Sequence, residues 1–331
     1  MGRLKLDGAC EENMSPSLHS MRDSAVNRLL GLSLRDSLTG VQGSLERIEC
    51  QNLELREQYS ALRNEYSAFE ERLAFQDRRI RAQLEQAKQE RDNIPSLKAQ
   101  LEAARQTAEY GAVFREKEPL VTVRIPAFKK TTELMDVAIA SVLKQTYDRF
   151  EIIVVNDGPN ESTRKAIEGL NESRIRYVEF PEQNKYPDDP HLRWMVAGSP
   201  GMNLGAEMAQ GSWIAPLDDD DEFTADHVEK LLALALDQEA ELAYGALTQK
   251  HLTHGTENRI WSYPPAISQF SFMGAIYMKP LNFFRYDQQS WIVDEPGDWN
   301  LIRRMTLAGV RMAATEDIVG TMYSVSYTHK S

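Results

Sequence analysis

Four consecutive aspartates, Asp218 to Asp221, directly follow the short apolar segment Trp213–Leu217. This pattern predicts a buried strand that ends in a cluster of carboxylates. Because four like charges repel one another, a folded chain crowds them where something neutralises them. Carboxylate oxygens suit Mg²⁺ or Mn²⁺, and a divalent cation at a strand end can hold a phosphate leaving group. The alternative interpretation is an acidic turn that caps the next helix.

Alternating strand and helix patterns begin at residue 120. The strand-like segments before the aspartates are Leu120–Ile125, Phe150–Val155 and Ile175–Phe180. This alternation predicts a parallel sheet with helices on both faces, which binds ligands beyond the carboxyl ends of its strands. Pro126, Asp157 and Asp218 each follow or end such a strand. We therefore expect these three residues to line one site.

A seven-residue repeat of apolar positions occupies residues 34–106, and Glu, Arg, Gln and Lys fill the positions between them. A heptad repeat of this length predicts a coiled coil, most simply with a second copy of the chain as the partner. The alternative is a helix that folds back on the globular domain. Pro95 is expected to break or kink the helix. We expect residues 1–33 to be poorly ordered, 107–118 to be a linker and 119–331 to be globular.

The composition excludes several classes of protein. A net charge of −12 over 331 residues argues against a nucleic-acid partner, because phosphate backbones attract a basic surface. The two cysteines, Cys10 and Cys50, fit a reducing compartment. The N-terminal segment lacks the pattern of a secretory signal, and no run approaches the roughly 20 apolar residues of a membrane span. The expected location is the cytoplasm, in solution or peripheral to a membrane.

Six segments carry a resemblance to a known family. They are Val121–Pro126, Ala140–Tyr147, Glu151–Gly158, Asn203–Gly211, Leu217–Asp221 and Asp298–Met305. In this order, residues 119–331 resemble the family 2 glycosyltransferases, which have the nucleotide-sugar-binding GT-A fold. Each motif alone is weak, but six in order are specific. The resemblance implies an α/β fold with a Rossmann-like mixed sheet, preceded here by the long α-helical coiled coil.

The resemblance also implies roles for the matched residues. The implied donor-binding residues are Pro126, Ala127, Asp157, Lys185, Asp218 and Asp219. The implied ligands of Mn²⁺ or Mg²⁺ are Asp220, Asp218 and His329, with Asp220 in direct contact. Asp298 would be the general base that removes the acceptor's hydroxyl proton. Because Gly297 stands where the family usually has Glu, Asp294 and Glu295 remain alternatives for the base.

The implied activity is inverting, metal-dependent, non-processive transfer of a sugar from a nucleotide diphosphate to a hydroxyl group. The acceptor class stays open between a glycan, a lipid-linked molecule and a protein. A sugar-nucleotide pyrophosphorylase is one alternative, but no Gly-rich, Arg-bearing phosphate loop follows the first strand. A non-catalytic coiled-coil scaffold with a relic transferase domain is another, and the intact aspartate cluster argues against it.

Overall fold

The computed structural model describes the backbone of residues 32–324, with side chains from residue 38 onward. The chain divides into two compact units at the sequence boundary between Gln83 and Leu84. The first described unit is the greater part of helix α2 (Leu32–Asp92), and the second contains every other described element. Almost all of the segment 1–33, expected to be poorly ordered, lies outside the described residues.

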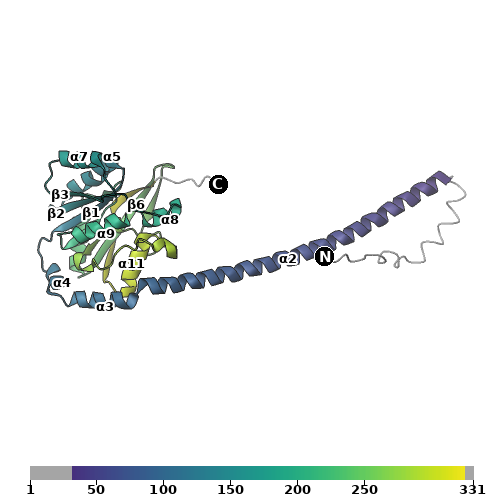
Figure 1. Cartoon of the computed structure of the whole chain (residues 1–331), viewed down its shortest axis with the longest axis horizontal. Helices are drawn as coiled ribbons and strands as arrows, with labels where there is room; N and C mark the ends of the chain where they lie inside the picture. Colours follow the sequence, from purple (N-terminus) through teal and green to yellow (C-terminus); the bar gives the residue numbers. More distant parts are fainter. Residues whose placement is uncertain (1–31, 325–331) are drawn as a thin grey trace. The chain divides into compact units, whose positions relative to one another are not determined.

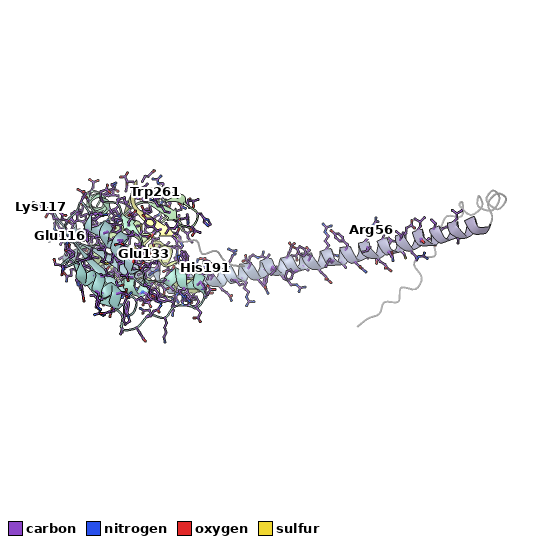
Figure 2. The ribbon with its side chains drawn as sticks, turned by 90° about the horizontal axis from the view of Figure 1, so that it is seen from above. Arg56, Glu116, Lys117, Glu133, His191 and Trp261 are labelled. Atoms are coloured by element: carbon purple, nitrogen blue, oxygen red, sulfur yellow. The ribbon has the colours of Figure 1, made fainter. Side chains whose placement is uncertain are left out.

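The apolar heptad positions of α2 point into solvent along the first unit. Their side chains are between 49% and 69% exposed at Leu38, Val41, Leu45, Ile48, Leu55, Tyr59, Leu62, Tyr66, Phe69, Leu73 and Ile80. Figure 2 shows the side chains projecting outward from this helix, with Arg56 among them. The long helix expected from the heptads is present. Its pairing in a coiled coil stays a prediction.

The last part of the predicted coiled coil belongs to the globular unit instead. Helix α2 ends at Asp92, Asn93 takes a left-handed conformation, and Pro95 begins α3 (Ile94–Arg105). Leu97 and Leu101, which continue the heptad, are buried in the globular core. The globular unit thus includes α3, although the heptads were expected to continue to residue 106. A period of 3.5 residues cannot be told from one of 3.6 over three turns, so a packed helix imitates the repeat.

The segment 107–118, predicted to be a linker, contains helix α4 (Ala108–Val113), in which Tyr110 and Val113 are buried. Polar contacts fix this segment and the end of α3 to the globular unit. The Tyr110 hydroxyl donates to the buried carboxylate of Glu241 and accepts from Arg311 at 2.8 Å. Arg105 donates Nε and a terminal nitrogen to the buried carboxylate of Glu241, at 2.7 and 2.9 Å. The backbone N–H of Arg311 donates to the same carboxylate at 2.7 Å. Charge-assisted pairs of this bidentate kind are among the strongest polar contacts.

A single mixed sheet organises the globular unit. Within residues 32–324 it has nine strands in the order β3-β2-β1-β4-β8-β6-β9-β5, and β7 pairs with β6. The parallel half comprises β3 (Ile175–Glu179), β2 (Phe150–Asn156), β1 (Val121–Ala127) and β4 (Trp213–Pro216). The other half comprises β8 (Ala275–Met278), β6 (Leu242–His251), β9 (Met312–Ser324), β5 (Glu222–Phe223) and β7 (Thr256–Ile260).

Helices cover both faces of the sheet, which explains why the central strands are buried throughout. Helix α9 (Ser199–Met208) packs on β1 and β2 (Figure 1). Helix α10 (His227–Asp237) packs on β6 and β9. Helix α11 (Gly297–Ala308) packs against α3. The remaining helical elements are α5 (Thr131–Glu133), the π-helix η2 (Leu134–Ile139), α6 (Ala140–Leu143), α7 (Glu161–Gly169), α8 (Pro190–Val196), and the 3₁₀ turns η3 (Phe272–Gly274), η4 (Lys279–Leu281) and η5 (Ser290–Val293).

Among the helices that the structure describes, none combines the length and the apolar character needed to cross a bilayer.

We predict that Leu101→Ala lowers the free energy of unfolding of the globular unit by about 2–5 kcal/mol, because it leaves a cavity in a packed core. Denaturant titration monitored by tryptophan fluorescence measures this loss. Leu62→Ala is the matched control, since Leu62 is 63% exposed on α2. The control is expected to leave the transition of the globular unit in place. Equal losses in the two variants would contradict the placement of α3 in the core.

Candidate active site

One cleft of about 780 Å³ lies at the carboxyl ends of β1, β2 and β4. These strands are adjacent and parallel, so their ends meet at one edge of the sheet. The residues expected from the sequence that line the cleft are Pro126, Ala127, Asp157, Asp218, Asp219, Asp220 and Asp298. Asp220 and Asp298 therefore share one cavity, although 78 positions of sequence would have allowed any separation.

The four aspartates after β4 have different surroundings. Asp218, Asp219 and Asp220 line the cleft. Asp219 also accepts a hydrogen bond from the backbone N–H of Phe128 at 2.9 Å, which ties the end of β1 to the aspartate turn. Asp221 does not line the cleft and accepts the backbone N–H of Tyr323 at 2.8 Å. Three carboxylates thus face the cleft, and the fourth fastens the turn to β9.

A lysine side chain partly balances the charge of these carboxylates. Lys130 Nζ lies 2.5 Å from Asp220 Oδ2 and 3.7 Å from Asp219 Oδ1. Within residues 32–324, it is the only side-chain cation that forms an ion pair with the three cleft aspartates. The Lys130 side chain is 47% exposed, so solvent can take the place of its ion pair with Asp220.

The carboxylates retain a surplus of negative charge. Burial raises the pKa of Asp218 to about 7, and repulsion from neighbouring carboxylates, Asp298 first, adds to the rise. Burial likewise raises the pKa of Asp219 to about 6. Such oxygens suit a hard divalent cation. The described residues contain no group of three or more candidate ligands, so a cation here would take further ligands from phosphate oxygens and water.

Asp298 lies in the first turn of α11 and lines the same cleft. Its Oδ2 accepts hydrogen bonds from Ser271 Oγ at 2.8 Å and from the N–H of Phe272 at 2.9 Å. Its Oδ1 accepts the hydroxyl of Tyr286 at 2.9 Å. A carboxylate offers about four lone pairs, so these three donors orient the group and leave capacity on Oδ1 for one more proton donor.

The two alternatives for the base lie elsewhere. Glu295 is buried and accepts hydrogen bonds from Arg303 and Asn300 at 2.7–2.8 Å. Asp294 is an exposed residue that ends η5 in a left-handed conformation. Neither lines the cleft. Of the three acidic candidates, Asp298 alone faces the aspartate cluster.

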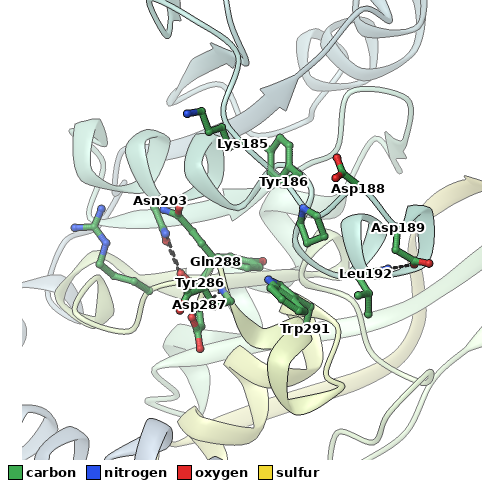
Figure 3. A pocket seen from close by; sticks show the side chains of 13 residues that line it. Lys185, Tyr186, Asp188, Asp189, Leu192, Asn203, Tyr286, Asp287, Gln288 and Trp291 are labelled. Atoms are coloured by element: carbon green, nitrogen blue, oxygen red, sulfur yellow. Dashed lines mark hydrogen bonds between the residues drawn. The ribbon is translucent and has the colours of Figure 1, made fainter.

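Asp157 follows β2 and is held by three donors. Its Oδ1 accepts the backbone and side-chain N–H groups of Asn184 at 2.9 and 2.7 Å, and its Oδ2 accepts the Tyr186 hydroxyl at 2.9 Å. The segment after β3 is thereby fastened to the end of β2. Lys185 lines a neighbouring cavity of about 900 Å³ instead of the cleft (Figure 3). His329 lies outside the described residues.

Sequence reasoning missed Ser271, Tyr286 and Arg124. The first two reach Asp298 from loops that only the fold brings together, so no local pattern could have identified them. Arg124 did leave a signal, because a charged residue in the middle of an apolar strand is unusual. That strand was interpreted only as apolar, and Arg124 is 1% exposed in it.

Residues 122–187 and 191–307 match the sequence profile of glycosyl transferase family 2. Because the match covers more than half of the chain, the protein belongs to this family. The GT-A class of fold expected from the sequence, with a mixed sheet after a long helix, is confirmed.

This chain matches its relatives over only part of their length. An uncharacterized glycosyltransferase of Rickettsia bellii is 29% identical over 164 residues, covering 49% of this chain and 21% of the relative. The UDP-Glc:alpha-D-GlcNAc-diphosphoundecaprenol beta-1,3-glucosyltransferase WfgD of Escherichia coli is 29% identical over 127 residues, covering 38% and 45%. The chain therefore spans less than half of either relative. The crystal structure of S. aureus TarS 1-349 in complex with UDP has a TM-score of 0.49 at 14% identity, covering 62% of this chain and 60% of that chain.

We predict that Asp218→Asn stabilises the metal-free protein more at pH 8 than at pH 5. The folded-state pKa of Asp218, about 7, lies above the ordinary value of 3.8. The folded state therefore binds this proton more tightly, and its contribution to stability is lost as the pH rises through about 7. The variant does not suffer this loss, and its extra stabilisation at pH 8 should reach at least about 1 kcal/mol.

Urea denaturation at both pH values in EDTA measures the difference. Asp237→Asn, at an exposed position at the end of α10, serves as the control and should show no comparable pH-dependent gain. An identical change in stability at pH 5 and pH 8 for Asp218→Asn would contradict the raised pKa.

Proposed function

We propose that this protein is an inverting, metal-dependent, non-processive glycosyltransferase that moves a sugar from a nucleotide diphosphate to an acceptor hydroxyl. The observation that carries the proposal is the shared cleft, which is lined by Asp157, by the aspartate cluster and by Asp298. This arrangement supplies a place for the nucleotide, carboxylates for a cation and a separate carboxylate for the acceptor.

The donor half of the cleft would work as follows. Pro126, Ala127 and Asp157 would line the pocket for the base and ribose. Asp220, with Asp218 beside it, would hold Mn²⁺ or Mg²⁺, and the bound cation would supply the positive charge that a diphosphate leaving group needs. Asp220 must exchange its ion pair with Lys130 for that contact. We retain Lys185 and Asp219 as further donor-binding candidates, and His329 as a candidate ligand.

The acceptor half depends on Asp298. Its Oδ1 would accept the proton of the acceptor hydroxyl, whose oxygen would attack the anomeric carbon from the face opposite the diphosphate. A carboxylate within hydrogen-bond reach suits this proton transfer. Ser271 and the N–H of Phe272 hold the other oxygen, so the carboxylate is oriented before the acceptor arrives. Because no Q-x-x-R-W motif follows the aspartates, we propose transfer of single sugars.

The name of the Escherichia coli relative suggests which donor and acceptor to assay first. UDP-glucose is the first donor to test, and a sugar attached to a lipid diphosphate is the first acceptor, because the name of the Escherichia coli relative contains both. Such an acceptor would place the enzyme in the cytoplasm or at the membrane surface.

We predict that Asp298→Asn lowers kcat/KM for sugar transfer by about 10²- to 10⁴-fold, because it removes the general base. Mass spectrometry of acceptor products with a panel of UDP-, GDP- and dTDP-sugars measures transfer in the wild type and the variant. Asp294→Asn is the matched control, since Asp294 is exposed and outside the cleft. Full activity of Asp298→Asn, or absence of transfer from every donor in the wild type, would contradict the proposal.

We also propose that the exposed heptads of α2 pair with a second copy of the chain. An exposed seam of Leu, Ile, Val and aromatic side chains over many turns has no cover within the first unit. Burying it against an identical helix removes this apolar surface from water, and no third component is needed.

The double variant Leu55→Glu, Leu62→Glu is predicted to be monomeric, because both substitutions place charges in the seam. Light scattering after size-exclusion chromatography gives the molar mass directly. The matched control, Leu53→Glu with Phe75→Glu, changes residues that are equally exposed but outside the heptad positions. This control should remain oligomeric. A monomeric wild type would exclude pairing through the seam.

A further inference from the structure

Arg124 places a permanent positive charge inside the sheet. It lies in the middle of β1, paired with β2 on one side and β4 on the other, and is 1% exposed. A guanidinium group stays charged in proteins. Burying a charge is costly unless it is paired and hydrogen-bonded, so a buried arginine requires an anion or an equivalent partner.

The expected direct partner is missing in the described part of the chain. No carboxylate there forms an ion pair with Arg124, and its Nε has no hydrogen-bond partner. The guanidinium interacts with the hydroxyls of two tyrosines, Tyr286 and Tyr277, and of these Tyr286 also contacts Asp298. A terminal nitrogen lies 3.3 Å from the Tyr286 hydroxyl, and the guanidinium carbon lies 5.2 Å from the centre of the ring.

Tyr286 connects this charge to the active-site cleft. Its hydroxyl has one proton, which it donates to Asp298 Oδ1 at 2.9 Å while its oxygen accepts from Arg124. Burial holds the pKa of Tyr286 well above its usual value, so the phenol keeps this proton. Asn203 on α9 fixes the tyrosine backbone through bonds of 2.9 and 3.0 Å. The result is a continuous path from guanidinium to phenol to carboxylate.

The charged groups around this path explain why a positive charge lies behind Asp298. Asp298 repels the negative charge of Asp218 in the shared cleft, and a positive charge behind Asp298 offsets this repulsion. Lys130 pairs with Asp220 and Asp219. Arg124 is the cation behind Asp298, and it lies within reach only through Tyr286.

We propose that Arg124 is a positioning residue whose buried charge, relayed by the Tyr286 hydroxyl, holds the Asp298 carboxylate oriented toward the cleft. The proposal rests on the proposed function in assigning proton acceptance to Asp298. It goes beyond that function in assigning a role to two residues that do not touch the acceptor's reacting oxygen. The competing explanation is that Arg124 only fills space in the core.

A double-mutant cycle tests the charge coupling without any assay of activity. Thermal unfolding is measured for Asp298→Asn in the wild-type background and in the Arg124→Met background. Neutralising Asp298 leaves Arg124 without its anion, so the change in Tm should be more negative with Arg124 than with Met by about 2–4 °C or more. Thr122→Val is the matched background control, because Thr122 is buried on the same face of β1 and bonds to Glu151.

The control background should reproduce the wild-type effect of Asp298→Asn. Identical changes in Tm in all three backgrounds would overturn the proposal. If Arg124→Met does not fold, Tyr286→Phe takes its place in the cycle, because it removes the relaying hydroxyl and keeps the ring. A cycle with Tyr286→Phe that shows no coupling would likewise overturn it.

Transfer kinetics provide the second measurement. Arg124→Met and Tyr286→Phe are expected to lower kcat at least about tenfold, while the Kd for UDP stays within about twofold. Arg124→Lys, which keeps the charge, should lose less activity than Arg124→Met. An unchanged kcat in both Arg124→Met and Tyr286→Phe would contradict the inference. A wild type without any transfer would instead defeat the proposed function, and the thermal cycle would still report whether the coupling exists.

Discussion

The concentration of negative charge at the carboxyl end of β4 is the constraint on which the rest of the cleft depends. Three aspartates face one cavity, and burial disfavours the ionised forms of Asp218 and Asp219. Among the described residues, Lys130 is the one cation that pairs with Asp219 and Asp220. Replacing these carboxylates with apolar side chains would remove the repulsion. Their presence is explained if a positively charged ligand, or a cation with its phosphate partner, completes the site. The buried aspartates lower the stability of the protein without ligand, as is common for residues that serve binding.

The two halves of the sheet make separate contributions to this cleft. Parallel strands β1, β2 and β4 deliver their carboxyl ends to one edge, which places Asp157 and the aspartate turn together. The second half brings Asp298 from the start of α11 and the Ser271 loop that orients it. Donor and acceptor chemistry would therefore meet where the parallel half joins the antiparallel strands. The buried Arg124 of β1 is connected to Asp298 through the hydroxyl of Tyr286.

The sequence predicted the parts of the fold that local patterns encode. Buried strands such as Phe150–Asn156 can be predicted from runs of β-branched residues, here Ile152–Val155. The aspartates directly follow a strand, so their position at the edge of the sheet could also be derived. The contacts of Tyr286 and Ser271 could not, because they arise between segments that are distant in sequence. Leu97 and Leu101 misled the heptad interpretation for a related reason: an apolar stripe does not reveal which surface covers it.

The most direct test of the central claim is calorimetric titration of UDP into the full chain, with Mn²⁺ and with EDTA, for the wild type and Asp220→Ala. If the aspartates hold a cation that binds the diphosphate, Mn²⁺ should tighten wild-type binding by at least about tenfold, or about 1.4 kcal/mol. In Asp220→Ala, Mn²⁺ should make little difference. Equal affinity of the wild type with Mn²⁺ and with EDTA would contradict the account.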